Sequence, residues 1–344
     1  MQKIRKNRIF VLSKLIVMYP LKFQPVLKSL IWGGEKICKF KNIESKQDGI
    51  GESWEISGLE DNVSVVSNGE WQGKSLDDLI NFFGERLLGQ SVMSRFGQTF
   101  PLLIKFIDAK EALSIQVHPD DELAKKRHNS FGKTEMWYVI NANENASLYS
   151  GFKTEINAKQ YEQSIENDTF TDYLQQHDVK AGDVFFLPAG RVHAISAGCF
   201  IAEIQQTSNI TYRIYDYNRK DENGNPRELH TEWAKEAIDY HVYPSYKMDY
   251  THEKQGVESL VTCSYFTVNL LNLKAGEHIE LKHQDTFVIY ICLYGKLQLI
   301  DNQNNKIQIR QGESVLVPAE NSSNIQLYFE QDSQLLETYI DDVK

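Results

Sequence analysis

One short pattern occurs twice in this chain, and it constrains the fold more than any other feature. Gly182-DVFFL-PA reappears as Gly312-ESVLV-PA, so each copy has a glycine, five residues and then Pro-Ala. Each copy is typical of a short buried strand bounded by turns. The segments before them, Met136–Tyr149 and Phe287–Ile300, both predict strand, turn and strand. Two such matches in the same order predict duplicated antiparallel β-barrels.

The rest of the chain predicts a mainly β protein with a few short helices in its N-terminal half. The 344 residues suggest about two domains, and the 17 Tyr and 17 Phe favour β structure. A polar stretch at Tyr243–Glu258 predicts the boundary, so we expect a metal-binding domain over 18–247 and a second β domain over 248–344.

Helical spacing and turn residues predict several local elements. Ser75 is the expected N-cap of an amphipathic helix, and a hairpin is expected around Ala142–Asn145. The predicted helices are Leu76–Leu88, Asp120–His128, Ile156–Leu174 and Thr231–Tyr240.

The first 17 residues are basic and then apolar, but Lys14 interrupts the apolar run and no small-residue cleavage site follows. This pattern argues against a signal peptide and favours either a start codon assigned too early, with Met18 the true start, or a loose N-terminal arm. No stretch approaches the roughly 18 apolar residues of a membrane-spanning helix, so no membrane partner is expected.

The net charge of −10 argues against nucleic acid as a partner. The four cysteines, none in Cys-x-x-Cys spacing, predict buried reduced thiols and a cytoplasmic location.

Four polar side chains near the first copy of the repeat suit a divalent metal. Gln116 and His118 are two apart and share a face on a strand, Glu135 lies in the string GKTEMW, and His193 follows a Pro-Ala-Gly turn. Two imidazoles, a carboxylate and an amide oxygen form a plausible ligand set. In the second copy Ser323 stands where His193 is expected, so that copy is predicted to be metal-free and structural.

Three of the four ligands have an alternative. Gln116 would instead support a ligand by hydrogen bonding, Glu135 would be a solvated strand charge, and His193 would be a hydrogen-bonded core histidine. Two histidines and one carboxylate also describe the iron site of non-haem oxygenases, whereas the neutral amide donor favours zinc.

A second polar segment runs from Glu203 to Asp216. Arg213 lies there in an aromatic and apolar run, so its charge is expected to face a specific group. The alternative is a structural salt bridge with Asp216 or another carboxylate.

These strings together resemble the type I phosphomannose isomerases in their short, Bacillus-like form. The resemblance covers Met18 to the C-terminus and also includes the strings LIWGG and GESWEIS. The chain departs from longer members in lacking a large helical insertion between Glu135 and His193, and from the general cupin pattern in having Gln-x-His in place of His-x-His.

The resemblance implies two cupin-type, jelly-roll barrels and interconversion of mannose 6-phosphate and fructose 6-phosphate. It implies one Zn²⁺ per chain, and it gives Arg213 a catalytic role. The implied zinc ligands are Gln116, His118, Glu135 and His193.

Such an isomerase moves one hydrogen between C1 and C2, and zinc stabilises the cis-enediolate as a Lewis acid. Candidates for the base are Glu203, Lys133 as a neutral amine, and a metal-bound water. Arg213 would hold developing charge or the phosphate, and Lys133 and Arg191 are either part of a cationic pocket or ordinary surface charges.

Two other functions compete with the isomerase. One is a metal-dependent cupin dioxygenase, and the other is a non-catalytic sugar-binding cupin. A hexose phosphate is the expected small-molecule partner, and the chain is expected to be a monomer or a homodimer.

Overall fold

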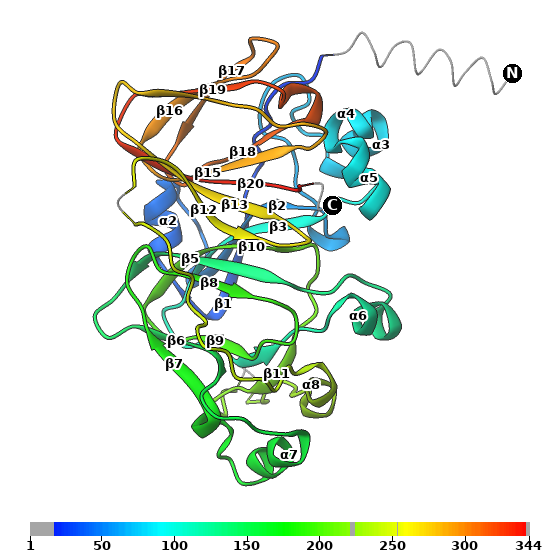
Figure 1. Cartoon of the computed structure of the whole chain (residues 1–344), viewed down its shortest axis with the longest axis vertical. Coiled ribbons are helices and arrows are strands. Elements are labelled where there is room, and N and C mark those ends of the chain that lie inside the picture. The colour runs from blue at the N-terminus through cyan, green and yellow to red at the C-terminus, as the bar shows by residue number, and fades with distance from the viewer. Residues whose placement is uncertain (1–16, 221–223, 253, 342–344) are drawn as a thin grey trace, which may run out of the picture. The chain divides into compact units, whose positions relative to one another are not determined.

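The computed structural model describes residues 17–220, 224–252 and 254–341, so the predicted extension lies, apart from Val17, outside the described residues (Figure 1). The chain divides into two compact units. The described parts of unit 1 are 17–24, 56–101 and 254–341, and those of unit 2 lie within 25–55 and 102–252. Both units are built mainly from β-strands, as predicted.

The predicted domain boundary at residue 247 lies close to the last division between the units, at residue 252. The chain also passes between the units after residues 24, 55 and 101. No change of composition marks those three crossings in the sequence, because strands and helices of both units share the same apolar and polar patterning.

Two sheets form unit 2. The first has six strands in the spatial order β1 (Val26–Gly34), β2 (Ile50–Ser57), β3 (Leu102–Asp108), β10 (Cys199–Gln206), β5 (Glu135–Ala142) and β8 (Val184–Leu187). The second has five strands in the order β11 (Tyr212–Tyr215), β4 (Ile115–Val117), β9 (His193–Ile195), β6 (Ser147–Phe152) and β7 (Leu174–Asp178).

Apolar side chains from the two sheets of unit 2 share one core. Trp137, Phe185 and Ile201 of the first sheet cluster with Leu148 and Ile195 of the second. The sheets therefore pack face to face, and each fully buried Leu, Ile or Phe contributes about 1.5–3 kcal/mol to this packing.

Short helices accompany the second sheet of unit 2. Helix α6 (Asp121–His128) forms as predicted, and the Asp120 carboxylate caps it by accepting from the Leu123 amide at 2.8 Å. Helix α8 (Thr231–Ala237) lies beside β11 in Figure 1, and α7 (Ala158–Glu166) lies below α8. Both helices pack into the same apolar cluster. A further helix, α2 (Lys36–Lys41), was not predicted.

The predicted helix Ile156–Leu174 is too long. Helix α7 ends at Glu166, Asp168 takes a left-handed conformation with φ of 56°, and a 3₁₀ turn η2 (Phe170–Tyr173) leads into β7. A left-handed residue interrupts helical hydrogen bonding, which the apolar spacing does not reveal.

Unit 1 repeats the two-sheet arrangement. Its five-stranded sheet has the order β12 (Gly256–Thr262), β13 (Thr267–Leu273), β20 (Ser333–Tyr339), β15 (Val288–Tyr294) and β18 (Ser314–Val317). Its four-stranded sheet has the order β14 (His278–Leu281), β19 (Ile325–Phe329), β16 (Lys296–Ile300) and β17 (Lys306–Arg310).

The helical part of unit 1 begins where the sequence predicts. The Ser75 hydroxyl caps α3 (Leu76–Phe83) by accepting from the Asp78 amide at 3.1 Å. The predicted helix is broken at Gly84, whose φ of 56° separates α3 from α4 (Glu85–Leu88). The other short helices are η1 (Glu60–Asn62), α5 (Gln90–Phe96) and η3 (Ala319–Asn321).

The repeat in the sequence corresponds to a repeat in topology. The run β3–β10–β5–β8 of unit 2 has the same order as β13–β20–β15–β18 of unit 1, and β4–β9–β6–β7 has the same order as β14–β19–β16–β17. The predicted hairpin is wrong, because β5 and β6 belong to different sheets. The turn between them carries the chain from one layer to the other, and an apolar pattern alone does not distinguish such a corner from a hairpin.

None of the helices in the described ranges is long and apolar enough to cross a membrane.

Candidate metal centre and substrate cavity

Three of the predicted metal ligands meet inside unit 2. Glu135 begins β5 in the first sheet, His193 begins β9 in the second, and His118 follows β4. All three are at most 1% exposed. One ligand atom from each lies within 4.8 Å of the others, so the two facing sheets bring together residues that are distant in sequence.

Backbone carbonyls set the tautomers of both histidines. Nδ1 of His118 lies 2.8 Å from the oxygen of Ile210, and Nδ1 of His193 lies 2.8 Å from the oxygen of Arg191. Since a carbonyl only accepts, both Nδ1 atoms carry the proton and both Nε2 atoms present a lone pair. Burial lowers the pKa of His193 to about 4 and that of His118 well below its usual range, so both rings are neutral.

Glu135 carries two buried oxygens, neither of which accepts a hydrogen bond from a described residue. They lie 3.3 Å from Nε2 of His193 and 3.5 Å from Nε2 of His118, and the latter nitrogen is also without a partner among the described residues. Burial, reinforced by the charge of Glu203, raises the pKa of Glu135 to about 7. Unpartnered buried polar atoms are costly, and a divalent cation between them would satisfy all three side chains.

Gln116 completes the group from the middle of β4. Gln116 is paired with His193 of the neighbouring strand β9, and its amide nitrogen lies 3.3 Å from Nε2 of His193. Turning the amide over puts its oxygen at this point, because the two amide atoms occupy equivalent positions. The four donors fit zinc, and the two histidines with one carboxylate also fit iron.

A cavity of about 150 Å³ in unit 2 contains the predicted catalytic residues Lys133, Glu203 and Arg213. Gln116 also lines it, so the cavity adjoins the candidate metal centre. Its other lining residues are Leu30, Trp32, Glu52, Lys105, Ile107, Leu113, Ser114, Trp137, Ile195, Asn209, Thr211 and Arg227.

Glu203 lies in a row of residues across the first sheet, between Lys105 of β3 and Trp137 of β5. Its Oε1 is 3.2 Å from Nζ of Lys105, and its Oε2 accepts from the indole of Trp137 at 2.9 Å. Burial alone would raise the pKa of Glu203, but the charge of Lys105 and these contacts bring it below its ordinary value.

Lys105 has no role in the sequence-based prediction. Burial alone would lower its pKa, but the carboxylates of Glu203 and Glu52, the latter 3.8 Å away, raise it above its ordinary value. Lys105 and Glu203 therefore form an ion pair. The signal that could have revealed Lys105 is a lone lysine within the apolar run PLLIKFI, since a buried charge needs a partner.

Of the other two predicted cations, Lys133 lies beside the candidate metal centre and Arg191 lies outside the cavity lining. Nζ of Lys133 lies 3.3 Å from Oε2 of Glu135. Arg191 does not line the cavity, and its guanidinium lies over the rings of Tyr243 and Tyr246, 4.6 Å from each centroid. Arg191 instead contributes its backbone oxygen, which orients His193.

Arg213 lies beside the metal ligands in the second sheet, where its Cα is paired with that of Gln116. The predicted alternative for Arg213 was an ion pair with Asp216, but the ion pairs of Asp216 are with Arg219 and Arg227. Arg213 instead donates from its guanidinium to the Glu228 carbonyl at 2.8 Å.

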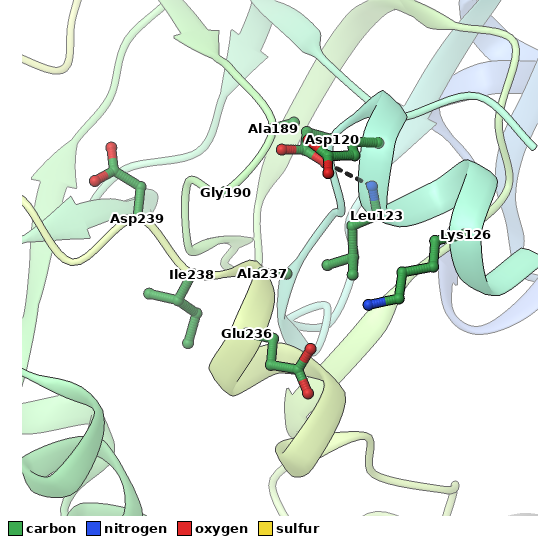
Figure 2. A pocket seen from close by; sticks show the side chains of 10 residues that line it. Asp120, Leu123, Lys126, Ala189, Gly190, Glu236, Ala237, Ile238 and Asp239 are labelled. Atoms are coloured by element: carbon green, nitrogen blue, oxygen red, sulfur yellow. Dashed lines mark hydrogen bonds between the residues drawn. The ribbon is translucent and has the colours of Figure 1, made fainter.

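A larger cavity of about 320 Å³ contains none of the predicted site residues (Figure 2). Its side chains include Asp120, Glu122, Glu236 and Asp239, with Lys126 at one side. Asp120 serves there as the cap of α6. The convergence of buried polar groups, not cavity size, identifies the site.

Fold and site together define a cupin-type protein whose unit 2 holds a candidate metal centre beside a charged cavity. Residues 20–168 match the catalytic domain of phosphomannose isomerase type I, and residues 257–326 match the cupin domain of mannose-6-phosphate isomerase.

Similar proteins cover most of the chain. The mannose-6-phosphate isomerase ManA of Bacillus subtilis is 36% identical over 306 residues, which is 87% of this chain and 93% of that protein. The mannose-6-phosphate isomerase of Streptococcus mutans is 34% identical over 87% of this chain and 92% of that protein. A crystal structure of the Bacillus subtilis mannose 6-phosphate isomerase superposes with a TM-score of 0.83 at 30% identity, covering 93% of this chain and 99% of that one.

The chain therefore belongs to the type I phosphomannose isomerase family, and it is an isomerase.

Proposed function

We propose that this isomerase interconverts mannose 6-phosphate and fructose 6-phosphate, with one zinc ion held by His118, Glu135, His193 and the amide oxygen of Gln116. The observation that carries the proposal is the set of unpartnered donor atoms on His118 and Glu135 beside a cavity that contains an ionised Glu203. The names of the relatives support the substrate.

Zinc bound to these donors would supply a Lewis acid that polarises the carbonyl group of the open-chain sugar. The chain's own residues would then move the proton. Glu203 is the proposed base, because its carboxylate is ionised, lines the cavity and is held by Lys105 and Trp137.

The proposed reaction needs no external oxidant or reductant. Glu203 removes the proton from C2 of mannose 6-phosphate, and the electrons of that C–H bond form the C1–C2 double bond of a cis-enediolate. The hydroxyl proton on O2 moves to O1, and Glu203 returns its proton to C1, which gives fructose 6-phosphate. The cation of Lys133 at the cavity wall would stabilise the negative charge of this intermediate, and the cation of Arg213 would hold the anionic substrate at the same wall.

The compartment is part of the same proposal. All four cysteines are free thiols, and two of them, Cys199 and Cys292, are buried. Free buried thiols support a reducing compartment, and we propose the cytoplasm.

A coupled isomerase assay on mannose 6-phosphate tests the proposal. The assay is run on the protein as purified, after chelation, and after addition of zinc or ferrous iron. Activity that is lost on chelation and restored by zinc is expected. An inactive zinc-loaded protein would contradict the proposed reaction, and oxygen uptake by the iron-loaded protein would support an oxygenase instead.

A further inference from the structure

Two arginines bond one buried carboxylate next to the substrate cavity. Asp216 is 5% exposed and bonds both Arg219 and Arg227, with Nε of Arg227 donating to Oδ2 at 2.7 Å. Arg213 lies three positions before Asp216 and lines the same cavity as Arg227. The geometry therefore concentrates positive charge at one end of β11.

The negative charges in this region do not balance the arginines. The buried carboxylate of Asp216 faces two arginines, and the other acidic group acting on Arg213 is Glu228, whose side chain is 84% exposed and therefore screened by water. Glu203 and Glu52, which line the same cavity, are paired with Lys105. In addition, Nε of Arg213 is buried and has no hydrogen-bond partner among the described residues. A half-buried guanidinium group with a spare donor and surplus charge favours an anionic ligand.

The surplus charge faces the cavity that contains the proposed catalytic groups. Arg213 and Arg227 both line it, whereas Arg219 does not line it and donates to the Ala112 carbonyl and to Asp216. Within the second sheet Arg213 is paired with Gln116, which is paired with His193, so a row of three residues joins the arginine to the candidate metal centre. Neutral hydroxyl and amide groups of Ser114, Asn209 and Thr211 line the same cavity.

We propose that Arg227 binds the phosphate group of the hexose phosphate together with Arg213, and that Asp216 is the positioning residue that holds Arg227. This assignment rests on the proposed function. A guanidinium group presents paired donors that match phosphate oxygens, and the bond from Nε to Asp216 fixes its plane. Arg227 thereby distinguishes phosphorylated from unphosphorylated sugars.

Steady-state kinetics on the zinc-loaded full chain test the assignment. The Arg227→Gln variant is expected to lower kcat/KM for mannose 6-phosphate by about 10- to 100-fold, mainly through KM. Asp216→Asn is expected to raise KM in the same direction by a smaller factor. Lys125→Gln is the matched control, because it removes one positive charge from an exposed position of α6 outside the cavity lining.

A binding measurement gives a readout that does not depend on turnover. Inorganic phosphate is titrated calorimetrically into the zinc-loaded wild type, Arg227→Gln and Lys125→Gln, after circular dichroism has established equal folding. Arg227→Gln is expected to weaken phosphate binding at least about 10-fold, and Lys125→Gln to match the wild type.

Phosphate binding that is equally tight in Arg227→Gln and wild type would overturn the assignment, and so would a loss of kcat/KM that comes from kcat with KM unchanged. The proposed function fails separately. In that case the wild type does not turn over mannose 6-phosphate, while phosphate binding still depends on Arg227.

Discussion

The two units share one strand topology but put different chemistry at matching positions. In unit 2, Lys105, Glu203 and Trp137 form a row across β3, β10 and β5. The matching row in unit 1, across β13, β20 and β15, is Asn269, Glu337 and Tyr290. A buried glutamate is therefore present at the centre of both rows, with different neighbours.

The metal ligands are replaced in unit 1. Glu135, which is paired with Leu187 just before the repeat's proline, matches Val288, which is paired with Val317. Gln116 is paired with His193, the first residue of β9. The matching pair in unit 1 is Leu281 with Ile325, the first residue of β19.

The strand register also corrects the expected position of the missing histidine. The residue that matches His193 is Ile325, not Ser323, because the 3₁₀ turn η3 lengthens the connection after Pro318 by two residues. The prediction that this position holds no metal ligand is unaffected.

One histidine has a counterpart. His118 lies two residues after Gln116, and His283 lies two residues after Leu281. Nε2 of His283 lies 3.0 Å from Oε1 of Glu337, whereas Nε2 of His118 has no hydrogen-bond partner among the described residues.

This difference separates a stabilising polar cluster from a functional one. Glu337 is satisfied by Asn269 at 2.9 Å, Tyr290 at 2.9 Å and His283 at 3.0 Å. In unit 2, by contrast, Nε2 of His118 and both oxygens of Glu135 have no hydrogen-bond partner among the described residues, and Glu135 has only the ion-pair contact with Lys133 beside the two histidines. A satisfied buried cluster stabilises a fold, while unsatisfied polar atoms lower stability and mark a site that binds something.

The largest expected effect is on metal binding. Glu135→Ala removes the carboxylate of the candidate centre, so we expect zinc content to fall from about one per chain to near zero and kcat/KM to fall at least ~10³-fold. Metal analysis and the isomerase assay measure both. Val288→Ala at the matching position is expected to keep zinc and activity and to lose only about 1–2 kcal/mol of unfolding free energy. Zinc retained by Glu135→Ala would contradict the ligand set.

A second comparison replaces each of the two buried glutamates by glutamine. Glu203→Gln should lower kcat by about 10²–10⁴-fold while zinc is retained, because an amide does not accept the C2 proton. Glu337→Gln should leave kcat unchanged and lower the free energy of unfolding by about 1–3 kcal/mol, because the amide mismatches the donor of Asn269. Denaturant titration and steady-state kinetics separate these effects, and an active Glu203→Gln would remove Glu203 as the base.

Metal removal should affect the units unequally. Zinc at 100 times its dissociation constant stabilises the folded state by about 2.7 kcal/mol. Chelation is therefore expected to reduce amide-exchange protection in β4, β9 and the start of β5, and to leave β14, β19 and β15 unchanged. Equal loss of protection in both sets of strands would show that the metal does not act within unit 2 alone.

The smallest effect is expected from the aromatic residue of each row. Tyr290→Phe removes one hydrogen bond to Glu337 and should cost about 1 kcal/mol of stability with no change in kcat. Trp137→Phe removes the bond to Glu203 and should lower kcat several-fold with a similar cost in stability. A fall in kcat for Tyr290→Phe would end the functional distinction between the rows.

The sequence by itself determined the type of fold and most of the candidate metal centre. The useful patterns are local, because each is set by residues that are close together in the sequence. They are the repeated Gly-x₅-Pro-Ala strings, the spacing of Gln116 and His118, and the turn before His193. For the same reason the cap at Ser75 and the helix α6 formed as predicted.

Only the tertiary structure decided which charges act together. Lys105 and Glu203 are 98 positions apart in the sequence, and Arg227 is 11 positions from Asp216, which it bonds, so neither contact leaves a local pattern. The same holds for the division of the chain at residues 24, 55 and 101 and for the corner between β5 and β6. These features depend on strand pairing between distant segments, and buried charges need partners. Both kinds of contact form only when the two sheets of a unit pack together.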